Sequence, residues 1–97
     1  MTEVVRWGII GTASIADKVG KAIANADGAR LIGIASRDIA KAEAWADERN
    51  VPARFGSYES ILEADNIDAV YIPLPPSMHM EWTINAAEKG KHVLCEK

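Results

Sequence analysis

Four short apolar runs, separated by longer segments with helical spacing, constrain the fold of this chain more than any other feature. The runs are Val4 to Ile10, Arg30 to Ala35, Ala69 to Ile72 and His92 to Cys95. None of them alternates polar and apolar residues over a long stretch. Strands that are buried on both faces have this pattern, and they are typical of parallel sheets covered by helices.

The segments between the apolar runs predict crossover helices. They are Ser14 to Ala26, Asp38 to Arg49 and Ser77 to Lys89, and each begins at a residue type that favours the N-cap. A short strand at Ala53 to Phe55 and a short helix at Ser57 to Ala64 complete a regular alternation. With short loops and right-handed crossovers, this order predicts one doubly wound, Rossmann-like α/β domain over residues 1–97.

Charge and cysteine content exclude several classes of partner. The chain has 97 residues, with 11 basic and 14 acidic side chains, and the basic residues form no stripe that nucleic acid would require. No apolar run approaches the roughly 20 residues that cross a bilayer, so we expect no membrane segment. Cys95 is the only cysteine, which excludes an internal disulfide and favours the cytoplasm.

A glycine turn follows the first apolar run, where a doubly wound sheet binds its ligand. The turn reads Gly11, Thr12, Ala13, Ser14, Ile15, Ala16. Backbone amides at the start of the following helix favour a phosphate, but Ala13 replaces the usual second glycine and should hold the anion slightly farther away. A glycine needed only for a tight turn remains the alternative.

The end of the second apolar run carries no carboxylate of the kind that binds the ribose of NAD. It carries Ser36 and Arg37 instead, and Lys41 follows on the next helix. The planar fork of a guanidinium suits the 2′-phosphate of NADP, which is therefore the predicted cofactor, with NAD as the alternative. The alternative is that both residues have only a structural role, with Arg37 solvated at the surface and Asp38 capping a helix.

A proline-rich segment follows the third apolar run and predicts a stiff wall beside the same crevice. Its candidate site residues are Pro73, Leu74, Pro75 and His79, although His79 fits a hydrogen-bonded scaffold residue as well. Beyond it, Met80, Ile84 and Ala87 recur at helical spacing with Trp82 beside them, which predicts a buried helix face. The histidines and the cysteine have no ligand spacing, so we expect no metal site.

Four stretches resemble the N-terminal cofactor domain of the Gfo/Idh/MocA oxidoreductases, and most closely the branch of dihydrodiol and xylose dehydrogenases. They are RWGIIGTASIA, ASRD, YIPLPPSMHMEW and GKHVLCEK. The resemblance implies hydride transfer between a nicotinamide cofactor and a hydroxyl-bearing carbon of a sugar, polyol or cyclic diol. It also implies that Glu96 and Lys97 close the nicotinamide site and that Lys97 is the catalytic residue. Pro76 stands where the family often has asparagine, so that side chain's hydrogen bond is missing.

The resemblance also implies a second α/β domain that binds the substrate and that lies outside these 97 residues. We therefore expect a fragment that binds cofactor weakly, is inactive alone, and self-associates through the bare edge of its last strand as a homo-oligomer. A non-catalytic nucleotide-binding module, sensing redox state or acting as a scaffold, is the alternative.

Overall fold

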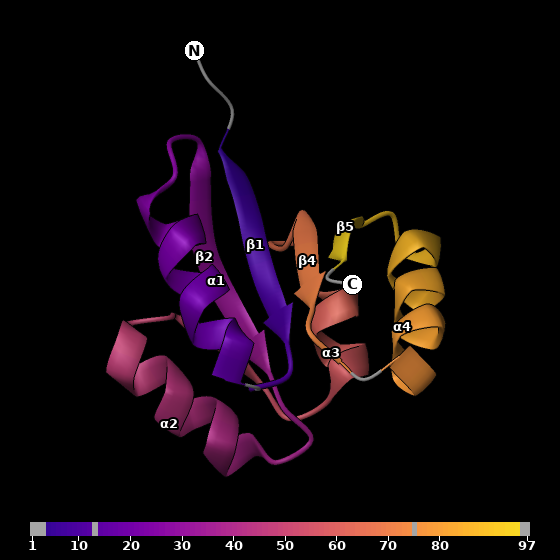
Figure 1. Cartoon of the computed structure of the whole chain (residues 1–97), viewed down its shortest axis with the longest axis horizontal. Helices are drawn as coiled ribbons and strands as arrows, with labels where there is room; N and C mark the ends of the chain where they lie inside the picture. Colours follow the sequence, from indigo (N-terminus) through magenta and orange to yellow (C-terminus); the bar gives the residue numbers. More distant parts are fainter. Residues whose placement is uncertain (1–3, 13, 75, 96–97) are drawn as a thin grey trace.

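The computed structural model of the chain describes residues 4–12, 14–74 and 76–95 (Figure 1). Nine elements alternate along them: β1 (Val5–Ile10), α1 (Ser14–Asn25), β2 (Ala29–Ala35), α2 (Ile39–Arg49), β3 (Ala53–Phe55), α3 (Tyr58–Glu63), β4 (Ala69–Ile72), α4 (Pro76–Glu88) and β5 (His92–Cys95). The alternation predicted from the sequence is confirmed, with element ends shifted by at most one residue.

The five strands form one parallel sheet in the order β3-β2-β1-β4-β5. The strand order reverses between β1 and β4, so the crossovers place helices on both faces and the predicted doubly wound fold is confirmed. At such a reversal the loops after neighbouring strands diverge and leave a crevice beyond the carboxyl ends of the strands. Strand β5 lies at the edge of this sheet.

Each face of the sheet has its own hydrophobic core. Ile9 and Ile34 pack with α1 and α2, whereas Ile10 and Ala35, their neighbours in sequence, pack with α3 and α4. The four residues are fully buried. Because successive side chains of a strand point to opposite faces, strands covered on both sides need apolar residues at consecutive positions.

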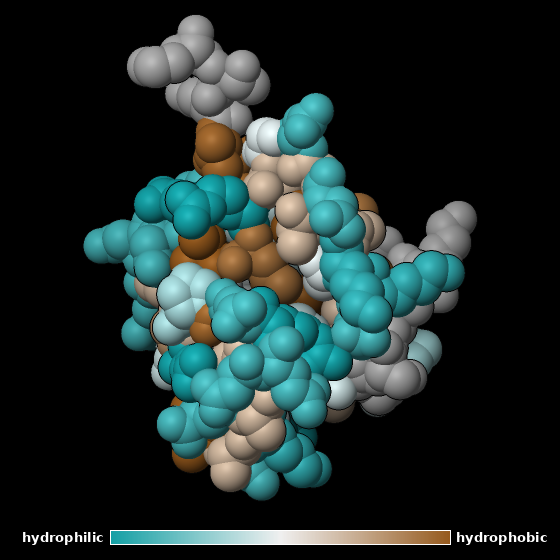
Figure 2. Space-filling view, turned by 90° about the vertical axis from the view of Figure 1, so that its left-hand side faces the viewer, coloured by the Kyte–Doolittle hydropathy of each residue, from teal (hydrophilic) through white to brown (hydrophobic). Residues whose placement is uncertain are grey.

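Helices α1 and α2 pack against each other through Trp45 and Gly20. A Cβ atom on Gly20 would lie 3.1 Å from the Trp45 ring, so this close approach favours glycine. Arg49 lies 4.3 Å over the same ring and binds Asp17 at 2.8 Å, and this hydrogen-bonded contact lowers the pKa of Asp17. Figure 2 shows this side of the molecule, where hydrophilic side chains surround a small apolar area.

The buried face predicted for α4 is wrong for Met80, Ile84 and Ala87 and correct for Trp82. Met80 is 73% exposed and Ile84 50% exposed, whereas Trp82 and Ala86 are buried against the sheet. Residues two positions apart lie about 200° apart around a helix, so the two apolar rows point in opposite directions. Periodicity shows both rows but does not decide which of them meets the sheet.

Two of the three predicted N-caps are also wrong. Helix α1 begins at Ser14 and α4 at Pro76, so Ser14 and Ser77 lie within the first turns. Proline suits the first helical position because its missing N–H has no partner there. Asp38 does cap α2, and its carboxylate accepts a hydrogen bond from the Ala40 backbone N–H at 3.0 Å.

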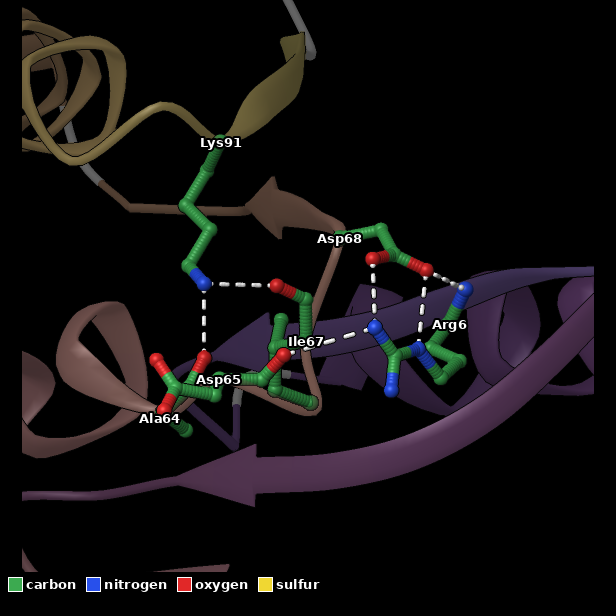
Figure 3. Close-up of polar contacts among 6 residues, drawn as sticks. All are labelled: Arg6, Ala64, Asp65, Ile67, Asp68 and Lys91. Atoms are coloured by element: carbon green, nitrogen blue, oxygen red, sulfur yellow. Dashed lines mark hydrogen bonds and ion pairs between the residues drawn. The ribbon is translucent and has the colours of Figure 1, made fainter.

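The amino ends of β1, β4 and β5 are joined by a polar network (Figure 3). The Asp68 carboxylate accepts hydrogen bonds from the backbone N–H, Nε and Nη2 of Arg6 at 2.9, 3.0 and 2.8 Å. The Lys91 ammonium donates to the carbonyl oxygens of Ala64 and Ile67, both at 2.6 Å. This network lies at the opposite end of the strands from the glycine turn, and it fixes their amino ends.

Candidate functional site

The glycine turn and the end of β2 are directly connected at the carboxyl edge of the sheet. The Gly11 backbone N–H donates to the Ala35 carbonyl at 2.7 Å. Parallel strands end at the same end of the sheet, so the segments after β1, β2 and β4 lie side by side there (Figure 1). The described residues among those predicted from these three stretches therefore lie at one end of the sheet.

Gly11 is required at the turn for two independent reasons. Its φ is +105°, which side-chain-bearing residues rarely adopt, and a Cβ there would lie 3.2 Å from Leu74 Cδ2 and 3.9 Å from the Tyr58 hydroxyl. The turn is thus a cradle that a Cβ would fill. A nucleotide phosphate fits this arrangement, because backbone can approach a ligand closely only where side chains are missing.

Helix α1 starts immediately beyond the turn. Its first residues, Ser14 and Ile15, have backbone N–H groups without partners inside the helix, and these groups with the helix dipole favour an anion. Thr12 is half-buried, and Ala16 is fully buried with Trp45 and Ile9 in the core, as its small side chain predicts. Ala13 lies outside the described residues.

The backbone at the end of β2 is held by a tight turn around Ser36. The Ser36 N–H donates to the Phe55 carbonyl at 3.1 Å, and the Ser36 hydroxyl accepts from the Asp38 N–H at 3.2 Å. The Ser36 side chain is 6% exposed, and the Asp38 carboxylate is occupied in capping α2. The helix cap predicted for Asp38 is therefore confirmed, and this cap engages one of its two carboxylate oxygens.

Arg37 is an exposed residue on this turn, but its guanidinium is not simply solvated. Its Cζ lies 5.2 Å from the centroid of the Tyr58 ring, and its Nη2 lies 4.0 Å from the Met78 sulfur. Among the described residues no carboxylate forms an ion pair with Arg37. Lys41 is exposed on the first turn of α2, so the carboxyl end of β2 carries positive charge.

The segment after β4 forms the far side of the crevice. Pro73 and Leu74 are half-buried, and Leu74 Cδ2 lies 3.2 Å from the point that a Cβ atom on Gly11 would occupy. His79, in the first turn of α4, has a buried Nε2 atom with no hydrogen-bond partner among the described residues. Pro75 lies outside the described residues.

The residues assigned to the nicotinamide end, Glu96 and Lys97, also lie outside the described residues. Strand β5 is parallel to β4, with Cys95 opposite Ile72, so it ends at the same edge as the crevice. His92, at the other end of β5, is exposed.

Sequence reasoning missed Tyr58 and Met78 as neighbours of Arg37. They lie 21 and 41 positions after it, on α3 and α4, and no local pattern connects them with β2. Only the sheet order brings these helices to the same strand end.

The described part of the chain lacks two features. It contains no helix long and apolar enough to span a membrane. It also holds no group of three or more His, Cys, Asp or Glu side chains arranged to bind a metal ion.

A parallel sheet of order β3-β2-β1-β4-β5, with a glycine turn between its first strand and helix, defines a Rossmann-type nucleotide-binding domain. The model of the oxidoreductase family with an NAD-binding Rossmann fold, GFO_IDH_MocA, matches residues 5–97, and the chain belongs to this family. The family predicted from the sequence is confirmed.

Individual relatives agree with this assignment. The chain is 50% identical over 91 residues to D-xylose 1-dehydrogenase (NADP(+)) 2 from Haloferax volcanii, covering 94% of this chain and 28% of the relative. It is 31% identical over 94 residues to trans-1,2-dihydrobenzene-1,2-diol dehydrogenase from Xenopus laevis, covering 95% and 28%. The predicted similarity to xylose and dihydrodiol dehydrogenases is confirmed.

A solved structure has the same fold at high similarity. KijD10, a 3-ketoreductase from Actinomadura kijaniata in complex with TDP-benzene and NADP, superimposes with a TM-score of 0.93 at 36% identity. The match covers 98% of this chain and 30% of KijD10. The chain thus spans less than a third of the length of these relatives.

Proposed function

We propose that residues 1–97 are the dinucleotide-binding domain of a larger, two-domain NADP-dependent oxidoreductase. The observation that carries the cofactor preference is the end of β2, where an exposed Arg37 has no ion-pair partner among the described residues and the Asp38 carboxylate caps a helix. A guanidinium in this position favours a 2′-phosphate, whereas the nearest carboxylate, that of Asp38, is engaged in a helix cap. The Haloferax relative, which is named for NADP(+), and KijD10, whose structure contains NADP, support the same preference.

In this proposal each part of the crevice binds one part of the cofactor. The pyrophosphate is bound by the backbone of the glycine turn, Gly11, Thr12, Ala13, Ser14 and Ile15. The 2′-phosphate is bound by Ser36, Arg37 and Lys41, and the wall beside the dinucleotide is lined by Pro73, Leu74, Pro75 and His79. The nicotinamide end is closed by Glu96 and Lys97. The buried, unpartnered Nε2 of His79 supports a polar partner at the wall.

The reaction we propose is hydride transfer to or from a hydroxyl-bearing carbon of a sugar, polyol or cyclic diol. The bound nicotinamide supplies the hydride chemistry. Lys97 binds and polarises the substrate oxygen, because an ammonium stabilises negative charge that develops there. The xylose, dihydrodiol and TDP-sugar chemistry in the names of the relatives supports this substrate class.

Two further properties complete the proposal. The single cysteine of these 97 residues is compatible with the cytoplasm. The edge strand β5, which pairs with β4 on one side in the described sheet, supports a homo-oligomer or a further strand at that edge.

Cofactor titration of the Arg37→Ala variant tests the proposal. We expect the dissociation constant of NADPH to rise about tenfold to a hundredfold, because hydrogen bonds to charged groups contribute about 1.5 to 3 kcal/mol, and that of NADH to change little. Arg30→Ala is the matched control, since Arg30 is an exposed arginine at the amino end of the same strand. Equal losses for NADPH and NADH would contradict the assignment of Arg37.

A further inference from the structure

Tyr58 lies between Arg37 and the glycine turn in the candidate cofactor site. Its ring faces the Arg37 guanidinium at 5.2 Å, and its hydroxyl lies 3.9 Å from the point where a Cβ of Gly11 would stand. Tyr58 is 8% exposed, so it is buried and not in solvent. None of the chemistry assigned above uses Tyr58.

The ring itself is held from two sides. Trp82 packs edge-on against it, with ring centroids 5.2 Å apart and planes at 90°. The backbone that carries it is fixed by Ser57, which caps α3 through a hydrogen bond from the Ser60 N–H. An aromatic residue held by a cap and by a second aromatic ring has few alternative rotamers, so it is a rigid support.

The Arg37 side chain depends on this support. Its backbone is fixed by the Ser36 turn, but an arginine side chain has about 2 kcal/mol of rotamer entropy to lose when it binds a ligand. Its contacts in the described part of the chain are the Tyr58 ring and the Met78 thioether, which is a weak acceptor. A ring face attracts the cation without accepting conventional hydrogen bonds, so the N–H donors remain available for a phosphate.

We propose that Tyr58 is a positioning residue that holds the Arg37 guanidinium at the end of β2 and thereby increases the preference for NADP over NAD. This inference rests on the proposed function, in which Arg37 binds the 2′-phosphate. Tyr58 acts by reducing the conformational freedom that Arg37 loses on binding, and preorganisation of this kind increases affinity without a new contact to the ligand. Met78, on α4, restricts the movement of the guanidinium in the same way.

The test compares Tyr58→Leu with Tyr58→Phe in NADPH and NADH titrations of the 97-residue chain. Tyr58→Leu removes the π face, and we expect it to weaken NADPH binding about two- to fivefold, as a partly exposed cation–π contact predicts, with NADH unchanged. Tyr58→Phe keeps the ring and should restore the wild-type ratio of the two affinities. Phe55→Leu is the control for loss of an aromatic ring, because Phe55 is half-buried on the neighbouring strand β3 and makes no cation–π contact with Arg37.

A double-mutant cycle separates positioning from general damage to the fold. In the Arg37→Ala background, Tyr58→Leu should cause no further loss of NADPH affinity, because its target side chain is gone. A further loss there, or equal weakening of both cofactors by Tyr58→Leu, would overturn the positioning role. If Tyr58→Leu does not fold cooperatively, Met78→Ala tests the same idea from the other side of the guanidinium, and an unchanged cofactor ratio would overturn it.

The failure of this inference is distinguishable from the failure of the proposed function. If the ratio of NADPH affinity to NADH affinity is unchanged in Arg37→Ala, the assignment of Arg37 to the 2′-phosphate is itself refuted. If this affinity ratio falls in Arg37→Ala but is unchanged in Tyr58→Leu, only the role of Tyr58 is refuted.

Discussion

The carboxylate of Asp68 is bound by three donors of a single residue, Arg6, across 62 positions of sequence. The Arg6 side chain and its backbone N–H hold the pKa of Asp68 at about 2, below the ordinary 3.8. The reverse backbone bond, from the Asp68 N–H to the Arg6 carbonyl at 2.7 Å, completes the pair. Strands β1 and β4 are therefore joined at their amino ends by charge as well as by the sheet.

The depressed pKa of Asp68 predicts an acid-sensitive contribution to stability. The folded-state pKa lies below the unfolded one, so the contribution is fully present above pH 4 to 5 and is lost as pH falls toward 2. Asp68→Asn should lower the free energy of unfolding by about 1 kcal/mol at pH 7, a value reduced by solvent screening of these partly exposed side chains. Denaturant unfolding at pH 7 and pH 2.5 measures the difference.

Asp65→Asn is the matched control for that experiment. Asp65 contributes its backbone carbonyl to Arg6, which the substitution leaves in place. The control should show the same stability change at both pH values, and a pH-independent loss in Asp68→Asn would contradict the prediction.

Lys91→Met should destabilise the fold by about 2 kcal/mol. The ammonium satisfies the carbonyl of Ala64, at the end of α3, and that of Ile67, and methionine keeps the length of the side chain without its donors. Thermal unfolding is the measurement. Lys89→Met, at an exposed position two residues earlier, should change stability by less than about 0.5 kcal/mol, and equal effects of the two variants would rule out the network as the cause.

Gly11→Ala should weaken NADPH and NADH by the same factor and lower stability by about 1 to 3 kcal/mol. The positive φ strains any side-chain-bearing residue, and the added methyl would also meet Leu74. Gly90→Ala is the control, because Gly90 has a φ of +76° but nothing within 4 Å of the added methyl. It should lower stability and leave both affinities intact, measured by cofactor titration beside thermal unfolding.

Substitutions on α4 should separate its two apolar rows. Met80→Gln is expected to change the free energy of unfolding of this chain by less than about 0.5 kcal/mol, since the side chain is 73% exposed. Trp82→Ala should cost about 3 to 5 kcal/mol, because it removes a buried ring. If denaturant unfolding shows a large loss of stability in Met80→Gln, the row that contains Met80 is buried against another surface and the prediction is wrong.

The sequence by itself determined the order of elements, the doubly wound fold and the local chemistry of two turns. Apolar runs without alternation require burial on both faces, glycine at position 11 permits the tight turn and its positive φ, and the Asp38 cap follows from a carboxylate before a helix. These features depend on neighbours within a few residues, so local propensity is sufficient to predict them.

Tertiary structure alone decided which surfaces meet. The row of α4 that packs on the sheet, the Arg6 and Asp68 pair, and the support of Arg37 by Tyr58 and Met78 all join distant positions. Such contacts depend on strand order and on the rotation of each helix about its axis, and a single sequence carries no periodic signal for either. The glycine turn is a local property, whereas the surroundings of the arginine beside it are a property of the fold.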